Sequence, residues 1–384
     1  MKALVFSRKP AKFAAAMVAG RLSPGSGAKV GPLSLRDVDP PELPGPDWVR
    51  VRPRLSGICG SDLATLDGTS SRWFEPIVSF PFTPGHEVVG ELDDGRRVVV
   101  VPVLSCAARG LHPACPPCAD GRINHCERLA FGDLEPGLQC GFCESTGGGW
   151  STLMLAHPSQ LVPLPDDLSD EAAVLVEPAA CAVHAASRVD ADRIALLGSG
   201  TLGLLTLAAL RQARPAAEIL ATAKHPHQRQ LAAAFGADQV VPPGELDRLV
   251  RARTGTMRYD NGQLGGGAEA VVDCVGSAES IAQALRIAAP GATIHTVGMP
   301  GVTTVDLTPL WQREVALRGA YAYARADFDT AVELIHTHDL GRLVSATYPL
   351  RRYEDAIAHA ASAGARGAVK IAFDLRADPE RDSI

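Results

Sequence analysis

The sequence lacks a long uninterrupted apolar run. The longest candidate, Leu202 to Leu210, contains Gly203 and Thr206 and is far shorter than the ~20 residues that span a bilayer. Lysines and arginines interrupt the first twenty residues, so they lack the apolar core of a signal peptide and are expected to form a strand and a turn. We therefore expect a cytoplasmic protein with no membrane partner.

A basic run or patch is also missing. The net charge is -6 and the pI is near 6.0, which argues against nucleic acid and favours a small-molecule partner. Nine cysteines, an odd and clustered set, suit metal ligation in a reducing compartment better than disulfides. A length of 384 residues with 46% apolar content predicts two domains.

Two short motifs contain metal-binding side chains. The first is Gly57 to Asp62, which holds Cys59, Ser61 and Asp62, and the second places His86 and Glu87 directly after a Pro-Gly turn. A thiolate, an imidazole and a carboxylate together suit zinc, and three protein ligands leave a fourth position for substrate. The motifs therefore predict a catalytic zinc site.

Four further cysteines lie close together in a lobe that spans about residues 104–127. They are Cys106, Cys115, Cys118 and Cys126. Four thiolates at this spacing predict a closed, structural zinc that folds a polar, proline-rich loop. The alternative is that the metal has been lost and the thiols are free or packed.

From Asp192 the pattern changes to strands that alternate with helices, which predicts an α/β domain with a doubly wound parallel sheet. A G-x-G-x-x-G fingerprint lies between the first strand and the first helix, where it suits the pyrophosphate of a nicotinamide dinucleotide. The cofactor-binding residues that it predicts are Gly198, Ser199, Gly200, Thr201, Leu202 and Gly203.

The end of the second strand of this domain bears on the choice of cofactor. An acidic residue about 20 positions beyond the fingerprint would bind the ribose hydroxyls of NAD. Ala223 stands there instead, and Lys224, His225 and Arg229 supply cations or donors for a 2'-phosphate. The sequence therefore predicts NADP in preference to NAD. The alternative is that Lys224 is simply solvated and both cofactors are used.

The motifs and the fingerprint together resemble the zinc-dependent alcohol dehydrogenases of the medium-chain dehydrogenase/reductase family, in the polyol, threonine and glucose dehydrogenase branch. The resemblance implies a GroES-like β-barrel catalytic domain over residues 1–187, a Rossmann domain over 188–323 and a return to the catalytic domain over 324–384. It also implies a homodimer or homotetramer. By the same resemblance, two later loops contact the cofactor through Cys274, Val275, Val297, Gly298 and Met299.

The resemblance also implies roles for single residues. Glu177, which precedes a proline, would face the catalytic zinc or its water together with Cys59, His86 and Glu87. Its alternative is an ordinary carboxylate at a helix N-terminus. Ser61 would take the substrate's hydroxyl proton. Asp62 is expected to orient His86 without binding the metal itself.

Two positions depart from the family pattern. His112 occupies the place of the usual first cysteine of the lobe, so Cys106 is the first choice for the fourth ligand and His112 its rival. Ala64 replaces the histidine that often completes the proton relay. The proton must then leave by another route, for which Glu177 with a zinc-bound water is the candidate.

The function implied is hydride transfer between NADP(H) and a secondary alcohol, polyol or sugar and its carbonyl product. A reductase of the same fold that acts mainly on carbonyls is the first alternative. A zinc-free quinone or enoyl reductase and a non-catalytic dinucleotide-binding protein are less favoured, because the proposed ligand set is intact.

Overall fold

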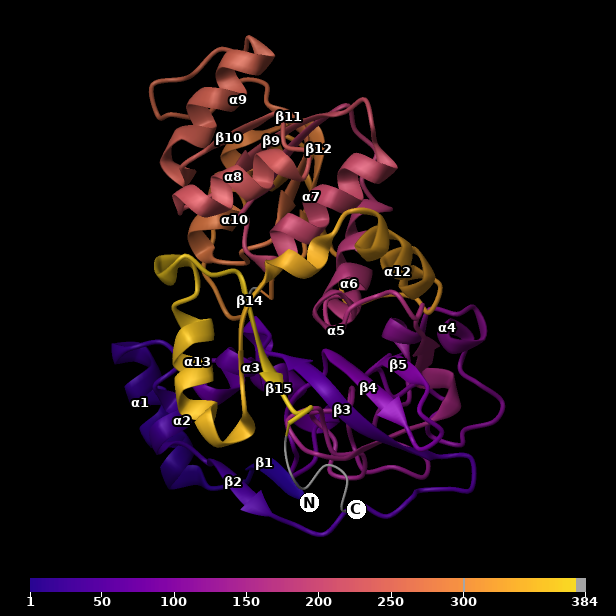
Figure 1. The fold of residues 1–384 in the computed structure, drawn as a ribbon. Helices are drawn as coiled ribbons and strands as arrows, with labels where there is room; N and C mark the ends of the chain where they lie inside the picture. Colours follow the sequence, from indigo (N-terminus) through magenta and orange to yellow (C-terminus); the bar gives the residue numbers. More distant parts are fainter. Residues whose placement is uncertain (300, 378–384) are drawn as a thin grey trace. The chain divides into compact units, whose positions relative to one another are not determined.

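The chain forms two compact units, which are shown as a ribbon in Figure 1. The computed structural model describes residues 1–299 and 301–377. One unit contains Met1–Glu177 and Tyr323–Ile384, and the other contains Pro178–Ala322. The second segment of the first unit is the C-terminal return. The sequence places the two boundaries at 187/188 and 323/324, and the two units divide at 177/178 and 322/323.

The first unit is built on strands. A two-stranded antiparallel sheet joins β1 (Lys2–Phe6) to β2 (Leu33–Asp37). The larger sheet has the order β14-β15-β3-β4-β5-β7, with β6 paired to β3. Its strands are β3 (Val49–Gly57), β4 (Val88–Leu92), β5 (Arg97–Val100), β6 (Met154–Ala156), β7 (Leu161–Pro163), β14 (Val344–Tyr348) and β15 (Lys370–Asp374).

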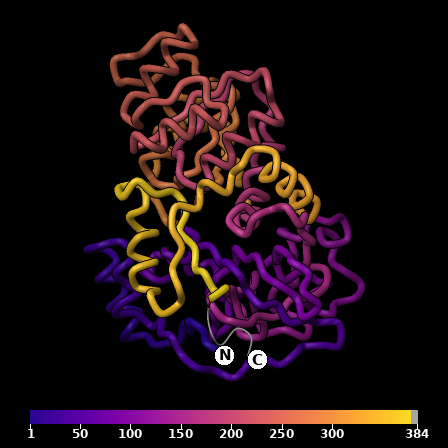
Figure 2. The backbone as a smooth tube through the Cα atoms, in the orientation of Figure 1, coloured from indigo at the N-terminus to yellow at the C-terminus, as the bar shows by residue number. Residues whose placement is uncertain are grey.

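The return segment completes this larger sheet. Strand β15 pairs antiparallel with β3, with Ala372 opposite Gly57, so β15 runs beside the end of β3. The tube in Figure 2 shows this yellow segment next to the purple first part of the chain. The rings of Trp150 and Phe373 meet edge to face in the core, with centroids 5.1 Å apart. A strand from near the end of the sequence is therefore part of the first unit's core.

The helices of the first unit are mostly short. They are α1 (Pro10–Leu22), α2 (Gly27–Val30), α3 (Gly60–Leu66), α4 (Pro116–Ala119), α5 (Asp170–Ala173), α12 (Asp327–Thr337) and α13 (Tyr353–Ala361). Helix α6 (Val176–Ala186) begins in this unit and continues into the other. The 3-10 turns are η1 (Arg72–Ile77), η2 (Ile123–His125), η3 (Pro158–Gln160), η5 (Leu340–Leu343), η6 (Leu350–Arg352) and η7 (Gly364–Arg366).

The expectation for the first twenty residues was only half right. Strand β1 forms, but the predicted turn is helix α1. Proline at the first helical position is preorganised for a helix, and the alanines that follow are the strongest helix formers. Local propensity therefore decides this segment, where the sequence analysis had weighed only its interruption by charges.

The second unit contains a six-stranded parallel sheet with the order β10-β9-β8-β11-β12-β13. In chain order within the unit this is 3-2-1-4-5-6, the Rossmann arrangement. Its strands are β8 (Arg193–Leu197), β9 (Glu218–Thr222), β10 (Gln239–Val241), β11 (Ala268–Asp273), β12 (Ala288–Thr296) and β13 (Ala316–Gly319). Its helices are α7 (Thr201–Ala213), α8 (Pro226–Ala234), η4 (Pro243–Glu245), α9 (Leu246–Thr254), α10 (Ala278–Ile287) and α11 (Thr308–Gln312).

Near the C-terminus, Arg376 is fixed by side-chain contacts. Its guanidinium forms ion pairs with Asp374, Asp170 and Glu171. Residues 378–384 lie outside the described part of the chain. In the described part, no helix is both long and apolar enough to cross a membrane.

Candidate active site

The first metal motif is shaped by the start of helix α3. Cys59 is the N-cap residue, and its backbone N-H donates to a carboxylate oxygen of Asp62 at 2.9 Å. The backbone N-H of Asp62 donates in return to the Cys59 sulfur. This reciprocal capping fixes the position of the thiol at the helix N-terminus.

The second motif places His86 beside that thiol. The carboxylate of Asp62 lies 3.4 Å from Nδ1 of His86, and the hydroxyl of Ser61 lies 3.5 Å from Nε2. Burial lowers the pKa of His86, but the charge of Asp62 and the Cys59 thiol outweigh burial and raise it well above the ordinary value. Asp62 therefore lies beside one ring nitrogen of His86, and Ser61 lies beside the other.

The sulfur of Cys59, a ring nitrogen of His86 and a carboxylate oxygen of Glu87 all lie within 4.8 Å of one another. His86 and Glu87 are buried and Cys59 is half-buried. Soft and hard donors this close, in one partly open site, fit a zinc ion with room for a further ligand. The residues present therefore suit the metal.

Lys370, on β15, is a member of the site that sequence reasoning missed. Its ammonium group forms an ion pair with Glu87 and donates to the carbonyl of Ile58 at 3.1 Å. Burial works against its charge, but the carboxylate of Glu87 outweighs burial and raises the pKa of Lys370. A single lysine in the apolar run from Ala368 to Phe373 was the available signal.

Glu177 lies outside the three-residue cluster, in the first turn of α6. Burial, with a smaller contribution from Glu87, raises its pKa to about 7, while His86, the hydroxyl of Tyr323 and Lys370 act in the opposite direction. Tyr323, which begins the return segment, is fully buried and was also missed. Glu177 is therefore a carboxyl group whose charge changes near neutral pH.

The glycine-tryptophan segment at 147–150, to which the sequence analysis gave no role, holds the two metal motifs together. The backbone N-H of Gly149 donates to Gly85 at 2.8 Å, and the indole of Trp150 donates to Gly57 at 3.2 Å. A Cβ on Gly148 would lie 2.1 Å from the carbonyl oxygen of Thr83. Only glycine permits this close approach of two chain segments.

The structure also gathers the four cysteines of the lobe. Their sulfurs lie within 4.8 Å of one another, and those of Cys106 and Cys126 are 3.8 Å apart. Tetrahedral zinc with Zn–S bonds of about 2.3 Å would separate its sulfurs by about 3.8 Å. The donor set and spacing therefore fit a closed zinc site, and His112 is not part of the group.

The insertion between Cys106 and Cys115 contains a fully buried arginine, Arg109. Its guanidinium donates to the carbonyls of Leu104, Phe131, Leu134, Glu135 and Gly137 at 2.6 to 3.3 Å. Because these acceptors come from both sides of the lobe, Arg109 satisfies backbone groups that the loop cannot pair by itself. The insertion is therefore part of the lobe's framework.

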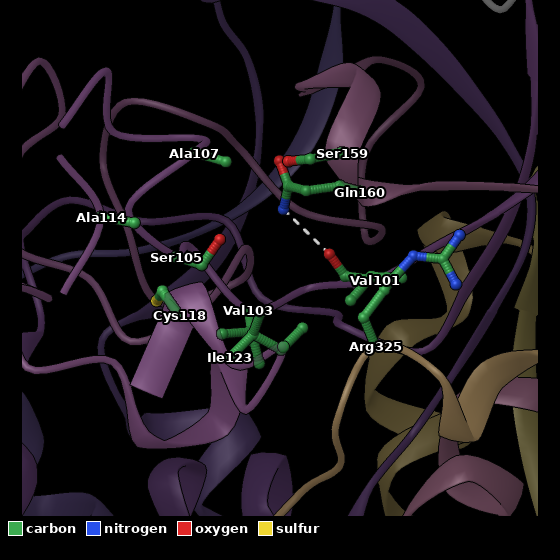
Figure 3. Close-up of a pocket in the computed structure, with 11 residues that line it drawn as sticks. Val101, Val103, Ser105, Ala107, Ala114, Cys118, Ile123, Ser159, Gln160 and Arg325 are labelled. Carbon is green, nitrogen blue, oxygen red and sulfur yellow. Dashed lines mark hydrogen bonds between the residues drawn. The ribbon is translucent and has the colours of Figure 1, made fainter. Parts of the chain in front are cut away.

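A cavity of about 240 Å³ lies against this lobe (Figure 3). Apolar side chains such as Val103 and Ile123 line it, together with Cys118 and Arg325. Gln160 closes part of the wall by donating to the carbonyl of Val101 at 2.9 Å. Arg325 belongs to the return segment and its backbone N-H bonds Gly121, so the return segment also supports the lobe.

The glycine fingerprint lies between β8 and α7 as predicted. Gly198 has a φ of 88°, and a Cβ on Gly203 would lie 1.8 Å from the carbonyl oxygen of Gly198. A Cβ on Gly200 would meet nothing within 4 Å, so space remains above the start of α7. Among the described residues no side chain caps this helix, which leaves backbone donors for a phosphate.

The later cofactor loops are shaped by Asp273 at the end of β11. Its carboxylate accepts from the backbone N-H groups of Val275 and Gly276 at 2.9 and 3.1 Å. Gly298 packs on the backbone of Cys274 and Val275, where a Cβ would lie 2.7 Å away. The side chains of Val275 and Met299 are exposed. Both loops therefore lie at the carboxyl edge of the sheet, where ligands bind in this fold.

The candidate 2'-phosphate group lies at the end of β9. Lys224 is exposed, and Arg229 folds back to donate to the carbonyls of Ala223 and Lys224 at 3.3 and 3.2 Å. The rings of His225 and His227 stack with centroids 5.9 Å apart. Four cationic or imidazole side chains therefore converge on one turn.

Comparison with known proteins identifies the family. A model described as the alcohol dehydrogenase GroES-like domain matches residues 45–166, and one described as a zinc-binding dehydrogenase matches residues 201–337. The chain belongs to the zinc-dependent medium-chain dehydrogenases. The resemblance that the motifs suggested is confirmed, as are the GroES-like and Rossmann folds.

Individual relatives of this zinc-dependent dehydrogenase support the same family assignment. Sorbitol dehydrogenase of Arabidopsis thaliana is 27% identical, over 93% of this chain and 99% of the relative. L-idonate 5-dehydrogenase of Vitis vinifera is 28% identical, over 86% and 89%. A solved zinc-binding dehydrogenase from Sinorhizobium meliloti, bound to NADP, has a TM-score of 0.72 and 26% identity, covering 97% of this chain and 98% of its own. The chain is therefore an alcohol dehydrogenase-type oxidoreductase that uses zinc and a nicotinamide cofactor.

Proposed function

We propose that this dehydrogenase transfers hydride between NADP(H) and a polyol or related secondary alcohol, or sugar, and the corresponding carbonyl compound. The substrate class rests on relatives described as sorbitol, xylulose and idonate enzymes. The observation that carries the proposal is the cluster of Cys59, His86 and Glu87 within 4.8 Å, because it brings a thiol and an imidazole together as zinc donors beside a buried carboxylate. An intact donor set argues against a zinc-free reductase.

For the catalytic metal we propose Cys59 and His86 as fixed ligands. When bound, zinc polarises the substrate's oxygen as a Lewis acid and lowers the alcohol's pKa. Asp62 orients the His86 ring, and Ser61, which lies 3.5 Å from His86 Nε2, receives the substrate's hydroxyl proton. Asp62, His86 and Ser61 are therefore already in place when the substrate binds.

The remaining ligand is proposed to come from Glu177 or from a water that it holds. Glu87 is already neutralised by Lys370, so its carboxylate has less charge to offer a metal. Glu177 has a pKa of about 7, which suits a group that accepts and releases a proton. It would supply the proton route that Ala64 cannot.

For the cofactor we propose NADP in preference to NAD. Lys224, His225 and Arg229 offer positive charge at the end of β9, where an acid would repel a 2'-phosphate. The test is the ratio of KM for NADP+ and NAD+. Lys224→Ala should raise the KM for NADP+ more than that for NAD+, with Arg251→Ala as an exposed control elsewhere in the unit. Equal effects on both cofactors would refute the preference.

The whole proposal is tested by metal analysis together with a substrate panel. About two zinc ions per chain and turnover of polyols, sugars or secondary alcohols are expected. Cys59→Ser should lose one zinc and all turnover while NADPH fluorescence titration stays unchanged. Glu177→Gln and Glu87→Gln, compared side by side, decide which carboxylate supports the metal. Absence of zinc together with absence of alcohol turnover would reject the function.

Two further expectations remain proposals. We propose a homodimer or homotetramer, to be measured by light scattering, and a cytoplasmic location. The structure contributes to the second only the absence of a membrane-spanning helix from the described residues.

A further inference from the structure

Helix α1 turns an apolar face outward. Of its thirteen residues only Ala16 is fully buried. At 100° per residue, the side opposite Ala16 holds Ala11, Ala14, Val18 and Leu22, with Arg21 among them. Val18 is 62% exposed and Leu22 is 83% exposed. A surface helix of a globular protein normally turns mostly polar side chains to water, so the outer side of α1 is unusually apolar.

Positive charge borders that apolar face. Arg21 lies on the outer side of the helix beside Val18, Lys12 is exposed one turn before Ala16, and Arg8, Lys9 and Lys29 flank the helix in sequence. No acidic residue precedes Asp37, although the chain as a whole carries a net charge of -6. The segment from Arg8 to Val30 is therefore a basic island on an acidic protein.

An exposed tryptophan lies close to this segment. Trp73, on η1, is 83% exposed. Its turn is linked to the start of α1 through Arg8, which lies 4.0 Å from Glu75. An indole combines apolar area with a polar N-H, the combination that favours the boundary between water and an apolar phase. We call α1 with Trp73 the basic-apolar surface.

The inner side of α1 is fixed to the protein. A Cβ on Gly68, just after α3, would lie 2.4 Å from the Met17 side chain. Asp67 accepts from the backbone N-H groups of Gly25 and Gly27 at 2.7 and 3.0 Å and so anchors the following turn and α2. The outer face is therefore presented on a supported helix, with its apolar side chains already exposed.

We propose that the basic-apolar surface docks the enzyme peripherally on membranes that contain anionic lipid. Apolar side chains at the centre of the face would enter the headgroup region, and the bordering cations would meet lipid phosphates and carboxylates. A second copy of the chain fits less well, because a two-fold axis through this surface would bring two basic islands together. The proposal departs from the sequence-based expectation of no membrane partner, which considered only spanning segments and a signal peptide.

The test is co-sedimentation of the full-length, zinc-loaded enzyme with vesicles. Phosphatidylcholine vesicles with about one third phosphatidylserine are compared with pure phosphatidylcholine at ~0.1 M and ~0.5 M salt. We expect binding to the anionic vesicles that weakens at the higher salt. Lys12→Gln with Arg21→Gln should reduce partitioning by about 25-fold, at about fivefold for each charge removed.

Two further variants test the apolar part. Val18→Ser with Leu22→Ser should reduce partitioning by roughly tenfold or more. Met257→Ser, an exposed apolar residue at 75% on the other unit, is the matched control and should bind like the wild type. Alcohol turnover in solution should be unchanged in all three proteins, which separates loss of docking from loss of fold.

Fluorescence gives an independent readout. Anionic vesicles should shift the tryptophan emission to the blue, and Trp73→Phe should abolish the shift, whereas Trp311→Phe should keep it. Equal binding to neutral vesicles, no binding to either kind, or equal loss in the Met257→Ser control would overturn the proposal. It would also be overturned if Val18→Ser with Leu22→Ser dissociated an oligomer, because the occupant would then be a second copy.

Discussion

Replacing Lys370 by methionine tests how the charge balance of the site supports the fold. Glu87 and Lys370 are nearly inaccessible, with side chains 2% and 3% exposed, so water cannot screen or replace their interaction. Breaking a buried pair by removing one partner costs about 3–5 kcal/mol. For a unit of this size that corresponds to a fall of roughly 6–20 °C in the unfolding midpoint.

The loss should be the same from about pH 5 to 8, because the lysine is charged throughout this range. In the wild type, Lys370 has a raised pKa, so its contribution is present throughout this range and is lost only above the ordinary lysine value.

Differential scanning fluorimetry of the metal-free and zinc-loaded proteins across this pH range measures the loss at each pH. Lys370→Arg keeps the positive charge and should lose little stability. Glu87→Gln with Lys370→Met removes both charges and should recover part of the lost stability. The reasoning is refuted if Lys370→Met melts within about 1 °C of the wild type at every pH, because a buried pair of this kind cannot be removed without cost.

Three further predictions concern other parts of the chain. Cys106→Ser should lose one zinc by mass spectrometry and unfold more readily with chelator, whereas His112→Ala should keep full metal content. Burial and nearby arginines lower the pKa of His295 to about 4, so the second unit should lose stability as pH falls from 6.5 towards 4; His295→Leu should flatten that dependence, by at most about 3 kcal/mol in urea unfolding. Gly203→Ala would place a Cβ 1.8 Å from the carbonyl oxygen of Gly198 and should abolish NADPH binding in a fluorescence titration while zinc content stays at its wild-type value.

Regular elements were predictable where local pattern and tertiary packing agree. The apolar pattern predicts strands at Val88–Leu92 and Glu218–Thr222 and a helix at Tyr353–Ala361, and these are the bounds of β4, β9 and α13. Strands buried on both faces read as short apolar runs, and the amphipathic helix repeats every three to four residues. Helix α1 was missed because apolar residues lie on its outer side as well as on its inner side, so the pattern has almost no helical repeat.

Site residues were predictable only where they lie within a short motif. Cys59 and His86 each stand beside partners that suggest metal chemistry, and the structure brings them together. Lys370 and Tyr323 lie far along the chain from the carboxylates that they contact, and no local pattern links them. Such contacts follow from strand pairing, which sequence periodicity does not specify across this distance.

The return segment therefore contributes more than a strand to the first unit. Because Ala372 pairs with Gly57, Lys370 lies beside the start of the cysteine motif, and a Cβ on Gly57 would lie 1.9 Å from the Glu87 carboxylate. Glycine at 57 and lysine at 370 are thus required by the same ion pair. The hydroxyl of Tyr323, at the other end of the segment, lowers the pKa of Glu177 through a hydrogen bond. Both buried acids, Glu87 and Glu177, are therefore contacted by residues of the C-terminal return segment. The metal site can reach its final charge state only after this segment has docked.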